Sequence, residues 1–261
     1  MIDLNFENQD LSRVPRITEE WLSLKSLSLF NNRIVTLPKS LFKLDNLEVL
    51  NVGHNCLTGV PSAIKNLVKI KMLDLGHNKI SWIPDSIGDL VNLEYFLYLS
   101  NNRLTRLPDS IKAFKRLRYL NASDNLLENI PAGIGKLRDL IELRLYNNKL
   151  TELPATITKL TKMRELYLMN NQIALLPPDL DGLSNLRILD LRNNHLTSIP
   201  NTIGNLKHLL YLDLRGNQLA DLPESIIGLS KLEKLDLRWN RKLHLPGFIQ
   251  ELKARGCLVY E

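Results

Sequence analysis

Apolar and polar residues alternate in short stretches that recur along the whole chain. In the stretch IELRLYNN, Leu143 and Leu145 fall on one face of an extended segment. A proline ends each such stretch, and apolar residues then recur three apart, as at Ile134, Leu137 and Leu140. The alternation predicts a short strand with one buried face. The later spacing predicts one or two helical or 3-10 turns whose inner side faces that strand.

Proline and asparagine keep one period through the chain. Eleven of the twelve prolines stand 23 residues apart, except that Pro84 and Pro108 are 24 apart. The same period holds for ten asparagines: Asn32, Asn55, Asn78, Asn102, Asn125, Asn148, Asn171, Asn194, Asn217 and Asn240. Such a period predicts a solenoid of stacked coils in which every strand runs parallel to the next. Since an asparagine amide both donates and accepts, we expect the ten to form a buried ladder of hydrogen bonds.

In register, the units read LKSLSLFNNRI, LEVLNVGHNCL and LRILDLRNNHL. This pattern resembles the leucine-rich-repeat superfamily, in particular its 23-residue intracellular class with the unit LP..I..L..L..L.L..N.L. Within that class it is most similar to the Ras-group proteins of animals and plants and to bacterial cytoplasmic members. The resemblance implies an α/β solenoid, a right-handed horseshoe with a concave parallel sheet of about twelve strands. Short helical, 3-10 or extended segments would form the convex side.

The repeat register implies a single domain over residues 1–261. We expect a degenerate capping unit over residues 1–23, where Gln9 replaces the ladder asparagine, and regular repeats over residues 24–246. Residues 247–261 are expected to form a capping helix and an edge strand. The one extra residue falls between Leu93 and Leu97, where a bulge directly before the strand would absorb it. The alternative is that the extra residue turns Tyr95 or Phe96 toward a partner.

Composition and charge exclude several classes of protein. The chain is 44% hydrophobic and 24% charged, which is typical of globular proteins. Its net charge of +6 is spread over both halves. The densest basic group, Lys112, Lys115, Arg116 and Arg118, is therefore interpreted as a solvated face rather than a nucleic-acid footprint. With no apolar run long enough for a membrane, no signal peptide pattern and only two cysteines, we expect a monomeric cytoplasmic protein that binds neither membranes nor nucleic acids.

Motifs for catalysis and cofactor binding do not occur in the sequence. There is no glycine-rich phosphate loop, Cys-x-x-Cys or His-Glu-x-x-His, so we expect no enzyme activity and no cofactor. The best metal candidates are His54 and His77, which stand at equivalent positions one coil apart. Two imidazoles are only half of an ordinary coordination shell, so a metal site is the less favoured interpretation.

Specificity must lie in the strand side chains that face away from the leucine core. Near the middle of the chain these are aromatic, with an arginine and a methionine beside them: Phe96, Tyr98, Tyr119, Arg144, Tyr146, Tyr167 and Met169. Because interface hot spots are enriched in aromatic residues, we expect them to bind a partner. The alternative is that rings on adjacent strands stack on each other and stabilise the sheet.

The last third of the chain carries two charged columns. An aspartate column (Asp190, Asp213 and Asp236) runs beside an arginine column (Arg192, Arg215 and Arg238). The two columns either compensate each other's charge within the sheet or bind an acidic or phosphorylated ligand. Both interpretations remain open at this point.

The sequence thus predicts a non-catalytic scaffold or adaptor that recognises a protein on its concave face. The resemblance implies intracellular signalling as a setting, with a small GTPase or another signalling protein as the partner. One alternative is the recognition module of a larger enzyme system such as a ubiquitin ligase. Another is an inert or engineered repeat scaffold.

Overall fold

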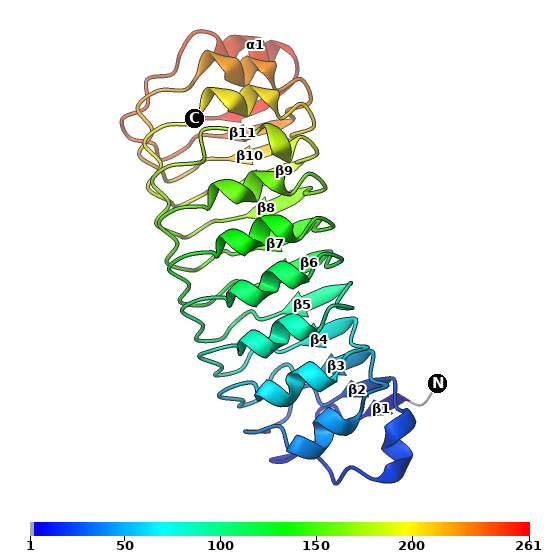
Figure 1. The fold of residues 1–261 in the computed structure, drawn as a ribbon. Coiled ribbons are helices and arrows are strands. Elements are labelled where there is room, and N and C mark those ends of the chain that lie inside the picture. Colours follow the sequence, from blue (N-terminus) through cyan, green and yellow to red (C-terminus); the bar gives the residue numbers. More distant parts are fainter. Residues whose placement is uncertain (1–2) are drawn as a thin grey trace. The chain divides into compact units, whose positions relative to one another are not determined.

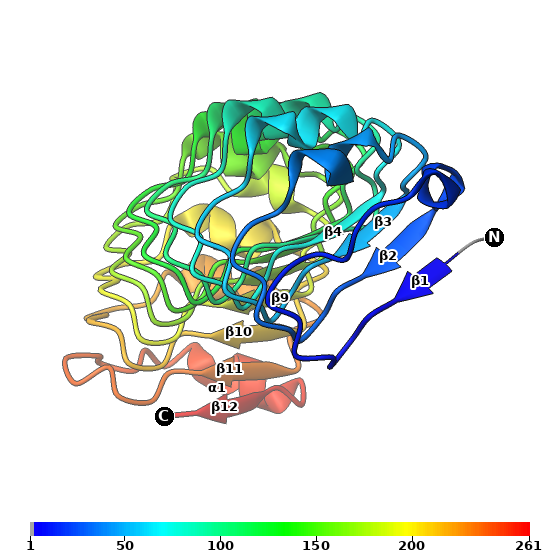
Figure 2. The ribbon, with the colours of Figure 1, turned by 90° about the horizontal axis from the view of Figure 1, so that it is seen from below.

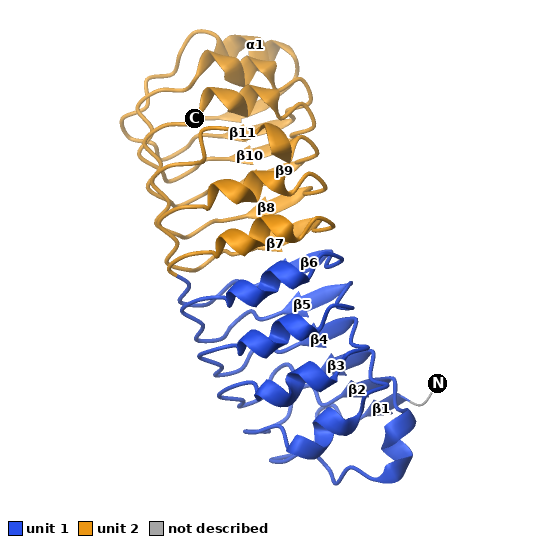
Figure 3. Ribbon diagram, viewed as in Figure 1, with its two compact units in different colours: residues 1–127 blue, residues 128–261 orange. Residues whose placement is uncertain are grey.

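The computed structural model describes residues 3–261 (Figure 1). The chain forms two compact units, Met1–Leu127 and Glu128–Glu261 (Figure 3). Each unit is a stack of similar coils, with a strand on one side of every coil and a short helix on the other (Figure 2). The predicted α/β solenoid is confirmed, as is the number of strands, twelve among the described residues.

The first unit has a parallel sheet whose strands follow the order of the sequence. They are β1 (Asp3–Asn5), β2 (Ser26–Ser28), β3 (Val49–Asn51), β4 (Met72–Asp74), β5 (Phe96–Tyr98) and β6 (Tyr119–Asn121). Neighbouring strands pair so that equivalent residues of successive repeats lie side by side, as Leu27 does with Leu50. The central leucine of each strand from β2 to β6 is buried, and the residues before and after it are partly exposed.

The second unit repeats this arrangement. Its strands are β7 (Glu142–Arg144), β8 (Glu165–Tyr167), β9 (Ile188–Asp190), β10 (Tyr211–Asp213), β11 (Lys234–Asp236) and β12 (Leu258–Tyr260). Pairing is again parallel and in register, from Leu143 beside Leu166 to Leu235 beside Val259. One face of each sheet therefore points into a leucine-rich core, and the other face is left for solvent or a partner.

The helices opposite the strands are mostly single 3-10 segments. In the first unit they are η1 (Glu19–Ser23), η2 (Lys39–Lys43), η3 (Ser62–Asn66), η4 (Asp85–Asp89) and η5 (Asp109–Ala113). In the second they are η6 (Ala132–Lys136), η7 (Ala155–Lys159), η8 (Asp181–Leu183), η9 (Asn201–Asn205) and η10 (Glu224–Gly228), followed by the α-helix α1 (Ile249–Ala254). Their inward residues, such as Ile134 and Ile203, are fully buried.

The periodic proline fixes where each of these helices begins. Pro131 has φ −63° and ψ 143°, an extended conformation that ends the preceding segment. Its carbonyl then accepts the first helical hydrogen bond, from the Ile134 N–H at 2.9 Å. Two helices are exceptions: η1 follows Thr18, whose carbonyl accepts from the Trp21 N–H, and η8 lies in the coil that contains the out-of-phase Pro178. There the Leu180 N–H donates to Thr202 Oγ1 at 3.2 Å instead, and η8 is only three residues long.

The ladder asparagines satisfy backbone groups at the turn after each strand. The Asn125 amide nitrogen donates to the carbonyls of Leu99, Ala122 and Ser123, and its Oδ1 accepts the Leu104 N–H at 2.9 Å. One side chain thus joins its own turn to the preceding coil. All ten are buried except Asn78, which is partly buried.

The residue before each ladder asparagine has a left-handed backbone, with φ between 50° and 64°. Asparagine, aspartate, histidine and glycine tolerate this conformation better than most residues. The column accordingly reads Asn31, His54, His77, Asn101, Asp124, Asn147, Asn170, Asn193, Gly216 and Trp239. Backbone geometry therefore accounts for His54 and His77 without any ligand.

The extra residue forms the predicted bulge directly before β5. The N–H groups of Glu94 and Tyr95 both donate to the Lys71 carbonyl, at 3.1 and 3.0 Å. On the other side, the Glu94 and Tyr95 carbonyls accept from consecutive residues of the next coil. The strand itself stays in register, with Met72 beside Phe96.

Replacing Asn125 with alanine should lower the free energy of unfolding by about 1–3 kcal/mol, because buried carbonyl and amide groups lose their partners. Asn125→Asp should be worse, since a carboxylate would face the three carbonyl oxygens. Urea unfolding followed by circular dichroism measures both. Asn92→Ala is the matched control, because Asn92 is only partly buried and donates one bond, to the Val68 carbonyl. Equal losses at positions 92 and 125 would contradict the role given to the ladder.

The exposed face of the sheet as candidate binding site

We call the side of each sheet that faces away from the leucine core the sheet face. It carries the first and third residues of every strand and the residue two positions further on. This is the face that the sequence predicts to be concave. Each unit has its own sheet face, and each is described by itself.

In the first unit the sheet face carries stacked aromatic rings. The Phe96 ring lies 5.4 Å from the Tyr98 ring and 4.9 Å from the Tyr119 ring, measured between ring centroids. All three side chains are partly buried rather than open to solvent as the sequence suggested. The reason is that rings on adjacent strands cover one another. These rings therefore contribute to the sheet as well as presenting one face outward.

In the second unit the aromatic residues are tied to charged groups. Tyr167 donates its hydroxyl hydrogen to Glu165 Oε2 at 2.8 Å, and the Arg144 guanidinium lies 5.4 Å from the Tyr167 ring centroid. Arg144 also pairs with Glu142. Burial, and then the bond to Glu165, raises the pKa of the Tyr167 hydroxyl. Tyr146 is partly buried on the neighbouring coil.

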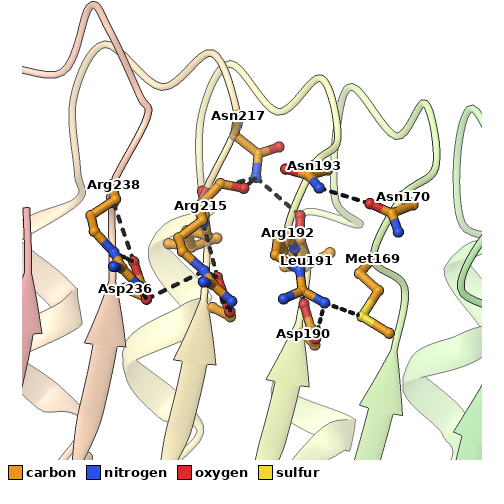
Figure 4. Close-up of polar contacts among 12 residues, drawn as sticks. Met169, Asn170, Asp190, Leu191, Arg192, Asn193, Arg215, Asn217, Asp236 and Arg238 are labelled. Carbon is orange, nitrogen blue, oxygen red and sulfur yellow. Dashed lines mark hydrogen bonds and ion pairs between the residues drawn. The ribbon is translucent and has the colours of Figure 1, made fainter.

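The charged columns form ion pairs along β10 and β11 (Figure 4). Arg215 Nη2 lies 2.6 Å from Asp213 Oδ2, and Arg238 Nη2 lies 2.6 Å from Asp236 Oδ2. Arg215 Nε also lies 3.3 Å from Asp236 Oδ2, so this arginine joins two coils. These contacts are those of charges that compensate one another within the sheet.

The pair on β9 differs from the other two. Arg192 Nη2 is 4.0 Å from Asp190 Oδ2 but only 2.7 Å from Met169 Sδ (Figure 4). Burial raises the pKa of Asp190, and the arginine does not offset this. At Asp236 burial also opposes ionisation, but Arg238 and Arg215 hold the pKa below its ordinary value. Asp236, which has a close guanidinium, thus has a lowered pKa, whereas the pKa of Asp190 is raised.

The two candidate metal ligands form a stack rather than a chelate. The rings of His54 and His77 are 3.9 Å apart between centroids and nearly parallel, at 14°. Asn101 Nδ2 lies 2.8 Å from His77 Nδ1. Burial, and then His77, lowers the pKa of His54. Within residues 3–261 no group of three or more histidine, cysteine, aspartate or glutamate side chains is placed to hold a metal ion.

Two aromatic residues escaped sequence reasoning: Trp239 in the turn after β11, and Tyr260 on the sheet face of β12. Trp239 is 67% exposed although its φ is +64°, a strained value for a bulky residue. Tyr260 on β12 lies 5.1 Å from the Arg238 guanidinium. The sequence did contain a signal for Trp239. This residue stands directly before a ladder asparagine, where the other coils have asparagine, histidine, aspartate or glycine.

The basic group of the first unit is partly neutralised. Arg116 and Arg118 both reach Glu94, at 2.9 and 3.3 Å. This pairing fits a solvated charged face. Over residues 3–261, no helix has the length and apolar character needed to cross a membrane.

Comparison with known families identifies the repeat. Matches to leucine-rich-repeat families cover residues 23–80, 61–104, 95–114 and 138–183, and a match to a leucine-rich repeat region covers residues 177–255. The chain is a leucine-rich-repeat protein. A comparison with curated protein sequences gives no match.

Solved structures with the same fold include a plant peptide hormone receptor in complex with RGF2 and the Toll–Spatzle complex. The plant peptide hormone receptor RGFR1 in complex with RGF2 is 28% identical, with a TM-score of 0.70 over 93% of this chain and 45% of the receptor chain. The PEPR1–AtPEP1 structure is 28% identical, with a TM-score of 0.71 over 86% of this chain and 38% of the matched chain. The Drosophila Toll–Spatzle complex is 26% identical, with a TM-score of 0.73 over 82% of this chain and 30% of the matched chain. The chain spans less than half the length of each of these.

Asp236→Asn should lower the free energy of unfolding at pH 7 by about 2 kcal/mol, since two arginines lose a charged acceptor whose side chain is 0% exposed. Because the folded-state pKa of Asp236 lies below its ordinary value of 3.8, its stabilisation is present above that pH and lost as the pH falls below it. In Asp236→Asn the free energy of unfolding should therefore fall less between pH 7 and pH 2 than it does in the wild-type protein. Urea unfolding from pH 2 to pH 7 measures both effects. Asp221→Asn, at an exposed position, is the control. Matching pH profiles for wild type and Asp236→Asn would contradict the assigned ion pairs.

Proposed function

We propose that this protein is a non-catalytic scaffold that binds a protein partner on its sheet face. One observation carries the proposal: the sheet face presents aromatic and arginine side chains on a backbone that is hydrogen-bonded from coil to coil. Residues held in this way lose little conformational freedom on binding, and tyrosine and arginine are enriched among binding hot spots. The likeness to the structures of RGFR1 with RGF2, PEPR1–AtPEP1 and Toll–Spatzle supports the same function.

The contact surface that we propose includes the residues expected from the sequence. In the first unit these are Phe96, Tyr98 and Tyr119. In the second they are Tyr146, Tyr167, Met169 and Arg144, with the aspartate–arginine pairs of β9 to β11 beside them. Arginines already paired with aspartates contribute less to affinity than to association rate and salt dependence. The rings are therefore the main source of binding energy in this proposal.

We propose intracellular signalling as the setting, with a small GTPase or another signalling protein as one partner class. The repeat class indicated by the sequence supports this assignment. Both cysteines are unpaired, Cys257 buried and Cys56 partly buried, which is typical of a reducing compartment such as the cytoplasm. Thiol labelling of protein isolated from its source should find both cysteines reduced.

We also propose that residues 1–23 and 247–261 act as caps of one repeat domain, with regular repeats between them. At the N-terminal end Phe6 stacks on Trp21 at 5.5 Å, which gives the first coil its own aromatic contact. At the C-terminal end Ile249 and Leu252 of α1 are buried, and β12 pairs with β11. Both segments thus shield the apolar interior of the adjoining coil.

Tyr146→Ala and Tyr167→Ala should each weaken partner binding by about 2 kcal/mol or more, as loss of a hot-spot ring does. A photoreactive phenylalanine at position 144 or 169 should cross-link the partner, and unlabelled wild-type protein should compete with that cross-link. Either tyrosine variant should compete at least about tenfold less well.

The matched control is Leu175, which is 60% exposed in the segment before Pro177. A photoreactive group at 175 should give no such cross-link, and Leu175→Ala should compete normally. Melting curves must show that the tyrosine variants are folded at the assay temperature, because these rings also contact their neighbours. Equal cross-linking from positions 144, 169 and 175, or full competition by both tyrosine variants, would refute binding on the sheet face.

Deleting residues 247–261 should expose Leu232 and Leu235 on the last regular coil, so the shortened protein should aggregate where the full chain is monodisperse. Light scattering across a concentration series measures this. Leu258→Ser is the control, because Leu258 is 60% exposed and its loss uncovers no core. A monodisperse shortened chain with unchanged melting would show that this segment is not a cap.

A further inference from the structure

The sheet face of the first unit contains an aspartate that pairs with no lysine or arginine of the described residues. Asp74, at the end of β4, accepts the Gly76 N–H on Oδ1 at 2.8 Å. Burial raises its pKa; the Gly76 N–H and then His77 and His54 act in the opposite direction, and no lysine or arginine of residues 3–261 does so. A Cβ added at Gly53 would lie 3.0 Å from this oxygen, and one added at Gly76 would lie 3.2 Å from it. The half-buried carboxylate therefore lies close against both glycines, and a side chain at either position would crowd it.

The second unit shows what occupies this place in another coil. Asp236 stands at the same strand position as Asp74, and its carboxylate is held by Arg238 and Arg215. Arg238 follows Asp236 by two residues, and Arg215 precedes it by 21. The positions with the same offsets from Asp74 are Gly76 and Gly53. Where Asp236 has two arginines, Asp74 has two residues without side chains.

The neighbouring strand extends the comparison. Asp236 pairs in register with Tyr260, and the Arg238 guanidinium lies 5.1 Å from the Tyr260 ring centroid. Asp74 pairs in register with Tyr98. Both coils therefore carry a carboxylate beside a tyrosine. In the second unit the Arg238 guanidinium contacts both of them.

We propose that Asp74 and Tyr98 bind an arginine side chain of the protein partner, in the place that Arg238 takes beside Asp236 and Tyr260. This inference rests on the proposed function and specifies its partner, which must present an arginine to the sheet face. Arginine fits better than lysine because its planar guanidinium forms paired hydrogen bonds with a carboxylate and stacks on an aromatic ring. Because Gly53 and Gly76 carry no side chains, neither position supplies a group that competes with the guanidinium for the carboxylate.

Nuclear magnetic resonance with a small probe tests the site without the partner. Titration with N-acetyl-arginine amide should shift the amide signals of Gly53 and Gly76 in a saturable manner. The signal of Gly216 should stay fixed, because its coil already contains the Arg215–Asp213 pair. The uncharged citrulline analogue should give no shift, and the lysine analogue should bind several-fold more weakly.

In Asp74→Asn the arginine probe should bind at least about tenfold more weakly, as expected when a charged hydrogen-bond acceptor is lost. No saturable shift in wild type, equal binding of the arginine and citrulline probes, equal binding of the lysine probe, or undiminished binding to Asp74→Asn would each overturn the proposal.

A second variant places the arginine on the chain itself. Gly76→Arg should form the Asp74 pair within its own strand and block the probe. We compare the change in melting temperature that Gly76→Arg causes in two backgrounds. This change should be about 2–4 °C more favourable in the wild-type background, which has Asp74, than in the Asp74→Asn background. Ser100→Arg is the control, because Tyr98 rather than aspartate precedes it by two residues. Absence of this coupling at position 76 would overturn the proposed geometry.

The two proposals fail in different ways. If the arginine probe binds at Asp74 but no partner cross-links from the sheet face, the proposed function fails and the arginine site stands. If a partner cross-links there but Asp74→Asn binds both the probe and the partner normally, the arginine site fails alone.

Discussion

The structure depends on how backbone amide and carbonyl groups are satisfied at the turn after each strand. These groups lie between stacked coils, away from water, where an unpaired group would cost about 1–3 kcal/mol. One asparagine per coil meets the requirement: Asn217, for example, donates to the Leu191, Leu214 and Arg215 carbonyls and accepts the Leu196 N–H. The period of the chain follows from this, since each coil must bring one amide to the same place. The periodic proline then directs the chain into the helical side of each coil, and the leucines form the core.

Fixing the backbone in this way leaves the sheet face free to vary. Along one column the side chain changes from Asp74 to Tyr98 to Arg144 while the central leucine of each strand stays the same. In the second unit the variation produced a set of aspartate–arginine pairs that neutralise each other. In the first unit it produced stacked rings and an aspartate flanked by glycines. The same scaffold positions therefore present different chemistry, which is what a binding surface on a repeat protein requires.

Sequence reasoning succeeded where one residue type has one structural role. Strand positions, the proline before each 3-10 helix and the bulge before β5 all follow from spacing, because a shifted register would bury polar groups. It was less successful on the sheet face, where side chains interact across coils. The rings at Phe96 and Tyr119 were expected to face solvent, but they cover each other. That Arg192 turns to Met169 while Arg215 bridges two aspartates depends on rotamers and neighbouring coils, which spacing does not specify.

Amide hydrogen exchange at Leu196 tests the central role of the asparagine ladder most directly. The Leu196 N–H donates to Asn217 Oδ1 at 3.0 Å, so its protection reports on a single ladder contact. In Asn217→Ala this amide should exchange at least about tenfold faster, in line with the loss of one buried hydrogen bond. The Leu168 N–H, which lies two coils from Asn217 and donates to the Asp190 carbonyl of the next coil, should keep more of its protection. Unchanged exchange at Leu196 would show that the asparagine side chain does not hold the coils together.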